Sequence, residues 1–464
     1  MPHTNYSTQV LLLGYSDVFD TPPDKIDTYL SGISRTTLLS AAEHFLGFKP
    51  TNRENIYDFL SWYCSKENAE FVDQICQKIK EKEKRLNKQF KIVNPLASLK
   101  LYEYCYNQNE VVDSITNIEL EQNIFKAYTL INETIDKKEL SHKNKYEYLA
   151  GDEKLIAVFL TPNIAKDEFI NYNLHNVNIC QVIKSVLFFE FLEKEKPVLL
   201  ESFINKLNAY DWKNLLRELI SFTWVVLNEG RQEGRTTIQI SNERNNRDWF
   251  CDFLDSFVNT FPKLSNPEKD FIELRSKPFY RMLEDFTYSI TYPLFAIEQI
   301  HKGLFFKVWE EDKTLKHTKD FRSFYCDFFS EKELFYKILK SLLPNNYKKL
   351  SGEEIKQRYN IDGEPDFYSR NEDNIFIFES KDILISAEIK HSYDYEAIKS
   401  ELQKKLLLNE RGRRKAIIQL TDNIHNTLNK TLKYDNEYNR SKAKIYPILV
   451  LHERMFNCLG LINL

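Results

Sequence analysis

Three side chains in the C-terminal third of the chain, Asp366, Glu379 and Lys381, are of types that can act together on a phosphate ester. Two carboxylates held close together repel each other unless a cation lies between them, and hard oxygen ligands of this kind suit Mg²⁺ or Mn²⁺. A lysine beside them can orient a water molecule and offset the charge of a phosphate. These residue types therefore predict metal-assisted hydrolysis of phosphodiester bonds, provided that the fold brings them to one point.

A strand hairpin would bring them together. Pro365, which fixes its own φ and has no N–H, suits the first residue of a strand, and Asp366 follows it. The polar residues 369–374 have the chemistry of a turn, and the bulky apolar run 375–378 favours a second strand. Because side chains alternate along a strand, the glutamate and the lysine should point to the same face, beside Asp366 across the hairpin.

A second Glu-x-Lys pair, Glu388 and Lys390, follows the first. The first pair is preferred, because it continues directly from an apolar strand and needs only one turn to reach Asp366. The second pair stays open as the alternative, in which case Glu379 lies on the surface or supports the site.

The order Pro365-Asp366, then Glu379-Ser380-Lys381, resembles the signature of the PD-(D/E)XK nuclease superfamily, which has the restriction-endonuclease-like fold. The resemblance implies that Asp366 and Glu379 bind Mg²⁺, for which Mn²⁺ can substitute, and that the Ser380 carbonyl adds a ligand. It implies that Lys381 positions the attacking water. It also implies an αβββαβ core, in which a helix is followed by three strands, a helix and a last strand.

The first helix of such a core is predicted at residues 324–343, where apolar side chains recur at helical spacing. In the superfamily this helix often lends an extra glutamate to the metal site. Glu333 is the candidate for that role, and Glu331 is the alternative.

Later segments complete the core. Helices are predicted at residues 395–408 and around Gln419, and the apolar run 445–451 predicts a buried strand. Pro447 within that run favours a strand at the edge of the sheet or a bulge. The predicted nuclease domain therefore spans residues 320–464.

The formal net charge of −4 does not by itself indicate a nucleic-acid-binding protein. The charge is unevenly distributed, because residues 404–444 hold eleven basic side chains and four acidic ones. A basic face beside an acidic metal site is what binding to a phosphate backbone requires, whereas a charge run alone is more often a solvated helix surface. The predicted contacts to the scissile strand are four polar residues: Gln419, Arg413, Arg414 and Lys415.

Residues 1–315 are predicted to form a mostly α-helical region that serves recognition, regulation or oligomerisation. The length of 464 residues allows two to three domains, and 11 glycines with long periodic segments favour helices. The fold class is therefore α+β, with the domain boundary in the charged run 310–319. A break between two subdomains is expected near 228–247, where four arginines either grip phosphate or line an ordinary polar loop: Arg231, Arg235, Arg244 and Arg247.

Two further expectations concern local structure in this region. The apolar pattern of residues 277–300 predicts a helix. Trp212 and Trp224, in a strongly apolar helical segment, are expected in the core rather than as platforms for stacking bases.

Other classes of protein are not supported by the sequence. It has no apolar run of eighteen residues, so no membrane-spanning helix is expected, and its polar start lacks the pattern of a signal peptide. The seven cysteines show no Cys-x-x-Cys spacing, which predicts reduced thiols in the cytoplasm and argues against structural zinc.

Together these patterns predict a Mg²⁺-dependent nuclease. The resemblance implies DNA, the commoner substrate of the superfamily, so the expected protein is a DNA endonuclease of prokaryotic restriction or anti-phage defence. The defence setting rests on analogy with chains that fuse a nuclease to a helical module. An RNA or tRNA nuclease, and a non-catalytic nucleic-acid-binding scaffold with a nuclease-like fold, are the alternatives. The expected partners are DNA or RNA, together with a second copy of the chain or a partner defence protein. Because such a nuclease can harm its own genome, the helical region is expected to restrain it.

Overall fold

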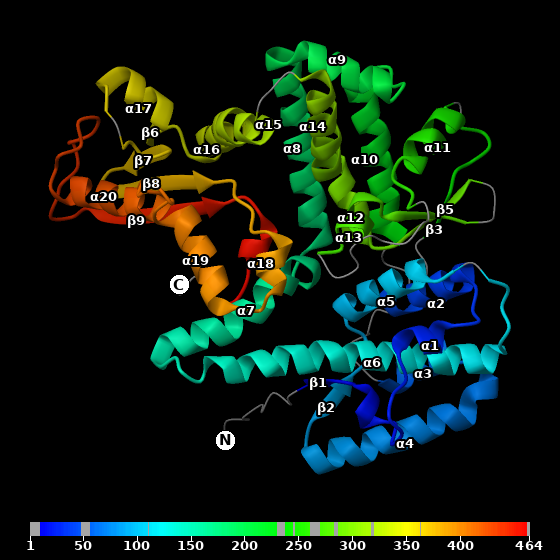
Figure 1. Cartoon of the computed structure of the whole chain (residues 1–464). Helices are drawn as coiled ribbons and strands as arrows, with labels where there is room; N and C mark the ends of the chain where they lie inside the picture. The colour runs from blue at the N-terminus through cyan, green and yellow to red at the C-terminus, as the bar shows by residue number, and fades with distance from the viewer. Residues whose placement is uncertain are drawn as a thin grey trace. The chain divides into compact units, whose positions relative to one another are not determined.

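Helices dominate the chain, and strands are interspersed among them (Figure 1). This is a computed structural model, and the residues it describes are 10–47, 56–109, 111–229, 237–244, 246–259, 270–282, 286–316, 320–361 and 363–461. The predicted α+β class is confirmed. In these ranges no helix is both long and apolar enough to cross a membrane.

The chain divides into two compact units, each built from separated stretches of sequence. Unit 1 holds Met1–Lys154, Phe169–Gln181 and Arg217–Gly303, and unit 2 holds Leu155–Glu168, Val182–Leu216 and Leu304–Leu464. Three helices contribute residues to both units: α7 (Gly151–Ile170), α8 (Leu174–Glu195) and α10 (Trp212–Glu229). The unit that contains residues 320–464 therefore also contains helical segments from much earlier in the chain.

Unit 1 is mainly helical because apolar residues recur at helical spacing through most of its length. Its other helices are α1 (Ile26–Leu30), α2 (Arg35–Gly47), α3 (Ile56–Tyr63), α4 (Ala69–Leu86), α5 (Pro95–Asn107), α6 (Asn117–Lys143), α11 (Arg247–Asp255), α12 (Ile272–Ser276), α13 (Pro293–Glu298) and the short η1 (Tyr15–Asp17), η2 (Lys66–Asn68), η3 (Asn144–Tyr146) and η4 (Gln299–Gly303).

Two small sheets also belong to unit 1. In the first, β1 (Val10–Leu12) pairs in parallel with β2 (Gln89–Lys91), and in the second, β3 (Thr237–Gln239), β4 (Phe279–Arg281) and β5 (Thr287–Ile290) are antiparallel in the order β3-β5-β4. The prediction of one helix over residues 277–300 is therefore wrong in its first half. All four residues of β5 are buried, Thr287 and Ser289 included, so the alternation of polar and apolar residues along this strand does not mark an exposed face.

Unit 2 contains the larger sheet, with the strands in the order β6-β7-β8-β9. The strand β7 (Phe367–Asn371) is antiparallel to both β6 (Lys348–Ser351) and β8 (Asn374–Lys381). The last strand, β9 (Lys444–Leu451), runs parallel to β8. The strand predicted at 445–451 is present as β9, but none of its residues is buried, so the prediction of a buried strand is wrong. Because β9 lies at the edge of the sheet, the missing N–H of Pro447 disturbs the strand pairing little. The turn between β7 and β8 is only two residues long, with Glu372 at a φ of 53°, so it is tighter than the predicted turn over 369–374.

Helices cover this sheet, and α20 lies across β8 and β9 (Figure 1). The helices of unit 2 in addition to the shared ones are α9 (Pro197–Lys206), α14 (Leu304–Leu315), α15 (Phe321–Phe324), the π-helical η5 (Tyr325–Tyr336), α16 (Lys337–Leu342), α17 (Gly352–Tyr359), α18 (Ala387–His391), α19 (Tyr395–Leu406), α20 (Ala416–Leu428) and η6 (Arg454–Phe456).

The two faces of the sheet are packed by different helices. Tyr368, Ile375 and Ile377 belong to a core with Ile355 of α17 and Leu420 of α20. Phe367 and Phe378 belong to a separate core with two aromatic side chains of η5, Phe335 and Tyr336. The alternation along β7 and β8 thus places odd and even positions against different helical layers, as a two-sided strand requires.

The helix η5 is itself held by an earlier part of the chain. The ring of Phe188 in α8 lies 5.2 Å from that of Phe329 and 5.5 Å from that of Tyr325. These edge-to-face contacts join α8 to η5, the helix that packs on the sheet.

Candidate active site

The hairpin of β7 and β8 brings Asp366, Glu379 and Lys381 together. Asp366 directly precedes β7, and the last residue pair of the hairpin is Phe367 with Phe378, so Asp366 lies beside the end of β8. The Nζ atom of Lys381 is 3.2 Å from Oδ2 of Asp366 and 3.3 Å from Oε2 of Glu379. These three residues of the predicted site therefore form one cluster.

The main chain of Ser380 faces the same cluster. Its N–H donates to Oδ2 of Asp366 at 2.7 Å, and the next carbonyl along β8, that of Lys381, accepts from the N–H of His452 on the β9 side. Since the polar groups of successive strand residues point to opposite edges, the Ser380 carbonyl is directed toward the Asp366 side. If the hairpin register is continued by two residues, it sets Pro365 opposite Ser380, and a proline has no N–H to offer that carbonyl.

Burial and like charge act strongly on this cluster. The side chain of Glu379 is fully buried, and burial together with the neighbouring Asp366 carboxylate raises its pKa to about 8. Burial acts to lower the pKa of Lys381, but the carboxylates of Asp366 and Glu379 outweigh it, so that pKa is raised and the amine stays charged. Oε1 of Glu379 is buried and has no hydrogen-bond partner among the described residues.

These observations fit a divalent cation. A buried carboxylate oxygen without a donor is costly unless a cation meets it, and two carboxylates with a main-chain carbonyl form a donor set that suits Mg²⁺. The described residues contain no group of three or more His, Cys, Asp or Glu side chains in metal-binding geometry. Since Mg²⁺ keeps several waters and binds through one or two carboxylates and substrate phosphates, a third protein carboxylate is not required.

The helix η5, which packs on the sheet, presents Glu331, and not Glu333, to the cluster. The pKa of Glu331 is raised, first by burial and then by the negative charge of Asp366, and its side chain accepts a hydrogen bond from the hydroxyl of Tyr336. Glu333 instead forms an ion pair with Lys337 one turn further along the helix. The preferred glutamate of the sequence prediction therefore lies away from the cluster, and its alternative lies next to it.

A cleft of about 300 Å³ opens beside Lys381. Glu331, Ser380 and Lys381 line it, and three of the four predicted nucleic-acid contacts lie along it as well: Arg414, Lys415 and Gln419. Arg414 is largely exposed and is paired with Asp422. Arg413, the fourth predicted contact, is exposed but does not line the cleft.

The second Glu-x-Lys pair has a different environment. It lies on the helix α18, not on a strand, and Lys390 is fully buried with its Nζ atom 2.6 Å from Oε1 of Glu168. Glu388 is exposed on the same helix. This geometry makes Lys390 part of a buried ion pair and leaves the first pair as the one beside Asp366.

Four residues that the sequence did not single out surround the end of β8. Asp382 accepts hydrogen bonds from Arg322 and from Ser330, the latter at 2.5 Å, and Nε2 of His452 lies 2.7 Å from Oγ of Ser380. Arg322 and Asp382 are 60 positions apart, and no spacing or motif links them. Only the folded chain identifies them.

The arginines near 228–247 do not form a phosphate site in the described part of the chain. Arg244 pairs with Glu218 and lies 3.9 Å from the centre of the Phe250 ring, and Arg247 donates to Asn242. Arg231 and Arg235 lie outside the described residues.

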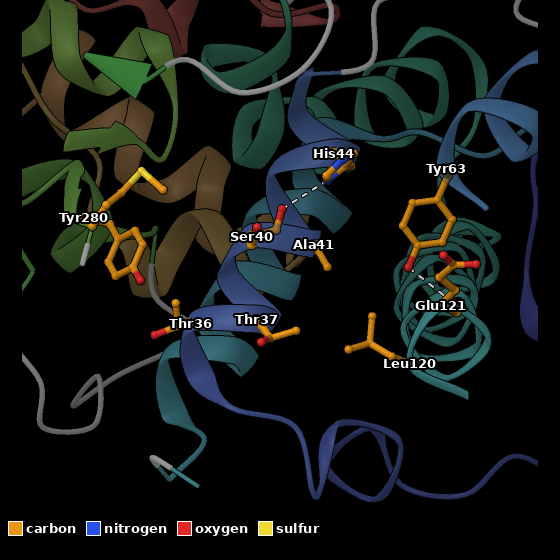
Figure 2. A pocket seen from close by; sticks show the side chains of 10 residues that line it. Thr36, Thr37, Ser40, Ala41, His44, Tyr63, Leu120, Glu121 and Tyr280 are labelled. Carbon is orange, nitrogen blue, oxygen red and sulfur yellow. Dashed lines mark hydrogen bonds between the residues drawn. The ribbon is translucent and has the colours of Figure 1, made fainter. Parts of the chain in front are cut away.

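Unit 1 has a larger pocket, of about 480 Å³, lined in part by α2. Figure 2 shows Thr37 and Ser40 on α2, with Tyr280 on one side of the helix and Tyr63 on the other. The carboxylate of Glu121, which also lines the pocket, accepts hydrogen bonds from Ser65 and Asn68. None of the described residues that line this pocket is Lys or Arg, so it lacks the charge that a phosphate would need.

Comparison of the chain with protein-family models, with curated proteins and with solved structures finds no match. The functional assignment therefore depends on the geometry of the site itself.

Proposed function

We propose that unit 2 is a metal-dependent nuclease domain of the restriction-endonuclease-like type, and that the chain hydrolyses phosphodiester bonds, most readily those of DNA. One observation carries the proposal. The Lys381 amine bridges two carboxylates, Asp366 and Glu379, beside a cleft that Arg414 and Lys415 also line. Acidic ligands beside a cleft that is lined by a charged lysine and by basic contacts are what phosphodiester hydrolysis requires.

The element order of unit 2 supports the same proposal. A helix, η5 continued by α16, comes before the three antiparallel strands β6, β7 and β8. The helices α19 and α20 follow, and then β9 lies parallel to β8. This order agrees with the αβββαβ core that the signature implies, with α17 inserted between β6 and β7.

The residues of the chain have distinct parts in the proposed reaction. Asp366, Glu379 and the Ser380 carbonyl would hold Mg²⁺, which when bound supplies Lewis-acid polarisation of a phosphoryl oxygen and a more acidic water. Lys381 donates a hydrogen bond to the attacking water and offsets the charge on the phosphate. Glu331 adds a further acidic group at the same cleft.

At the rim of the cleft, Arg414 and Lys415 bind the phosphate backbone of the substrate, and Gln419 donates to it. These contacts align the nucleic-acid strand with the acidic cluster and do not depend on the base sequence of that strand. By analogy with chains that fuse a nuclease to a helical module, the activity would serve prokaryotic defence. Residues 1–315 would then restrain the nuclease.

The test compares the full chain with Asp366→Asn and Lys381→Ala on plasmid DNA, linear DNA and RNA, each with Mg²⁺, Mn²⁺ or EDTA. Cleavage that needs the metal and falls by about 100-fold or more in both variants is expected, since each removes a group that acts in the transition state. Cutting of RNA in preference to DNA would change the substrate and keep the chemistry.

The matched control is Ser441→Ala, an exposed position after α20 whose hydroxyl bonds only to Asn439 among the described contacts. It should cut like the unaltered protein. Cutting that persists in EDTA, or that Asp366→Asn leaves unchanged, would show that another site or a contaminant is responsible.

A further inference from the structure

The strand β8 ends at Lys381, immediately after the residue whose carbonyl faces the acidic cluster. Residues 382–386 have no regular secondary structure. The end of a strand frays when no neighbour holds it, yet metal ligands must be placed to within about 0.5 Å to be effective. The geometry of Ser380 and Lys381 therefore depends on whatever fixes the chain at this point.

His452 fixes one side of it. This residue directly follows β9, and its main-chain N–H donates to the Lys381 carbonyl at 3.3 Å. Its ring nitrogen Nε2 lies 2.7 Å from Oγ of Ser380. One histidine thus holds both the main chain of Lys381 and the side chain of Ser380.

Arg322 fixes the residue that follows. Its Nη2 atom donates to the Asp382 carbonyl at 3.2 Å and also to the Asp382 carboxylate, which is almost fully buried. Ser330 of η5 donates to the other carboxylate oxygen at 2.5 Å, and Cys326 lies 3.6 Å from the Asp382 carbonyl. Asp382 is therefore held through both its main chain and its side chain.

We propose that His452 and Arg322 are positioning residues for the metal. Through Ser380 and Asp382 they hold the end of β8, so that the Ser380 carbonyl and the Lys381 amine keep their places at the cleft. Neither residue touches the metal or the substrate. The inference rests on the proposed function, because it concerns the same site.

The test measures metal binding directly, by titration calorimetry with Mn²⁺ alone, as well as cleavage. Five variants of the full chain are compared: His452→Ala, His452→Gln, Ser380→Ala, Ser380→Ala with His452→Ala, and Arg322→Met. Ser380→Ala removes the hydroxyl and keeps the carbonyl, so it breaks the contact with His452 without removing the proposed ligand. Ser441→Ala again serves as the control, and thermal melting shows which variants are folded.

We expect Mn²⁺ affinity to fall by about 10-fold in His452→Ala, in Ser380→Ala and in Arg322→Met, as for other groups that orient metal ligands. Because His452 and Ser380 act through one contact, the double variant should be no weaker than either single one. His452→Gln, whose amide can still bond the serine hydroxyl, should recover most of the affinity. A purely structural role would lower the melting temperature and leave the Mn²⁺ affinity of the folded protein unchanged.

The two proposals fail in different ways. Equal Mn²⁺ affinity in the unaltered protein and in His452→Ala overturns the positioning role, whether or not nucleic acid is cut. Mn²⁺ binding that depends on His452 without any cleavage overturns the nuclease and supports the positioning role. No Mn²⁺ binding by the unaltered protein overturns both.

Discussion

The Nζ atom of Lys390 lies 2.6 Å from Oε1 of Glu168, and both side chains are buried. Removing one member of a buried ion pair costs about 3–5 kcal/mol. Lys390→Met should therefore lower the free energy of unfolding by about that amount, as measured by urea denaturation. Adding Glu168→Leu to it should restore part of the loss, because the buried carboxylate is removed as well.

The matched comparison is Lys381→Met, which alters the other Glu-x-Lys pair. It should abolish cleavage while changing the unfolding free energy less, since Lys381 borders an open cleft. The reverse result, a folded Lys390→Met protein without activity beside an active Lys381→Met, would make the second pair the catalytic one.

The two glutamates of η5, Glu331 and Glu333, provide a second comparison. Glu331→Gln should reduce the rate of cleavage by about 10-fold or more, because Glu331 lines the cleft and interacts with Asp366. Glu333→Gln should have little effect on the rate, since it breaks only a partly exposed ion pair with Lys337. Single-turnover rates under saturating Mg²⁺ separate the two, and equal rates for both variants would remove Glu331 from the site.

Binding of the phosphate backbone is tested by salt dependence. Replacing Arg414 and Lys415 together by Gln should weaken DNA binding and lower the slope of log K against log salt by about 2, since each lost phosphate contact changes it by about 0.9. Arg413→Gln should leave that slope nearly unchanged, because this side chain does not line the cleft. Fluorescence anisotropy in EDTA measures both without cleavage, and a larger effect from Arg413 would redirect the path of the nucleic acid.

The buried Asp435 predicts a dependence of stability on pH. Burial acts to raise its pKa, but hydrogen bonds from Arg370 and Tyr368 and the nearby Lys348 lower it below the ordinary value. A depressed carboxyl pKa contributes stability above the unfolded pKa of about 4, and this contribution is lost as the pH falls through the folded value. Asp435→Ala should cost about 3 kcal/mol near pH 7, and the difference in melting temperature should shrink below about pH 4. A difference that stays constant down to pH 2 would mean that the pKa of Asp435 is the same in the folded and the unfolded protein.

The hairpin could be predicted from the sequence because its determinants are local. A proline, a polar turn and a β-favouring run lie within twenty residues, and alternation alone put Glu379 and Lys381 on one face. The choice between Glu331 and Glu333 could not be made in this way. Residues 325–336 form a π-type helix whose turns hold more than 3.6 residues, so the α-helical period does not predict which of the two glutamates faces the acidic cluster.

Trp224 is a different kind of error. Trp212 is buried as expected, but the Trp224 side chain is 65% exposed, so the expectation of a core residue is wrong. At 100° per residue, Trp224 lies about 200° from the buried Phe222, on the opposite side of α10. The helical period therefore predicts that Trp224 faces away from the core. The expectation of a buried side chain followed instead from the apolar character of the whole segment.

No local sequence pattern predicts which segments of the chain make up unit 2. Glu168 neutralises Lys390 across 222 positions, and Phe188 packs on η5 from another early segment. A chain cut to residues 320–464 would lose both contacts, so its inactivity would say nothing about restraint by the helical region.

The pairing of β8 with β9 also has a consequence for protein synthesis. The strand that carries Glu379 and Lys381 gains its second neighbour only when residues 444–451 have been made, about sixty residues after Lys381 itself. His452, which holds the end of that strand, follows immediately. On the ribosome the nascent chain therefore carries the acidic residues for about 3–14 seconds before the sheet that aligns them can close, at the usual elongation rate of about 5–20 residues per second. The order of translation itself thus delays the assembly of the site until β9 and His452 have emerged.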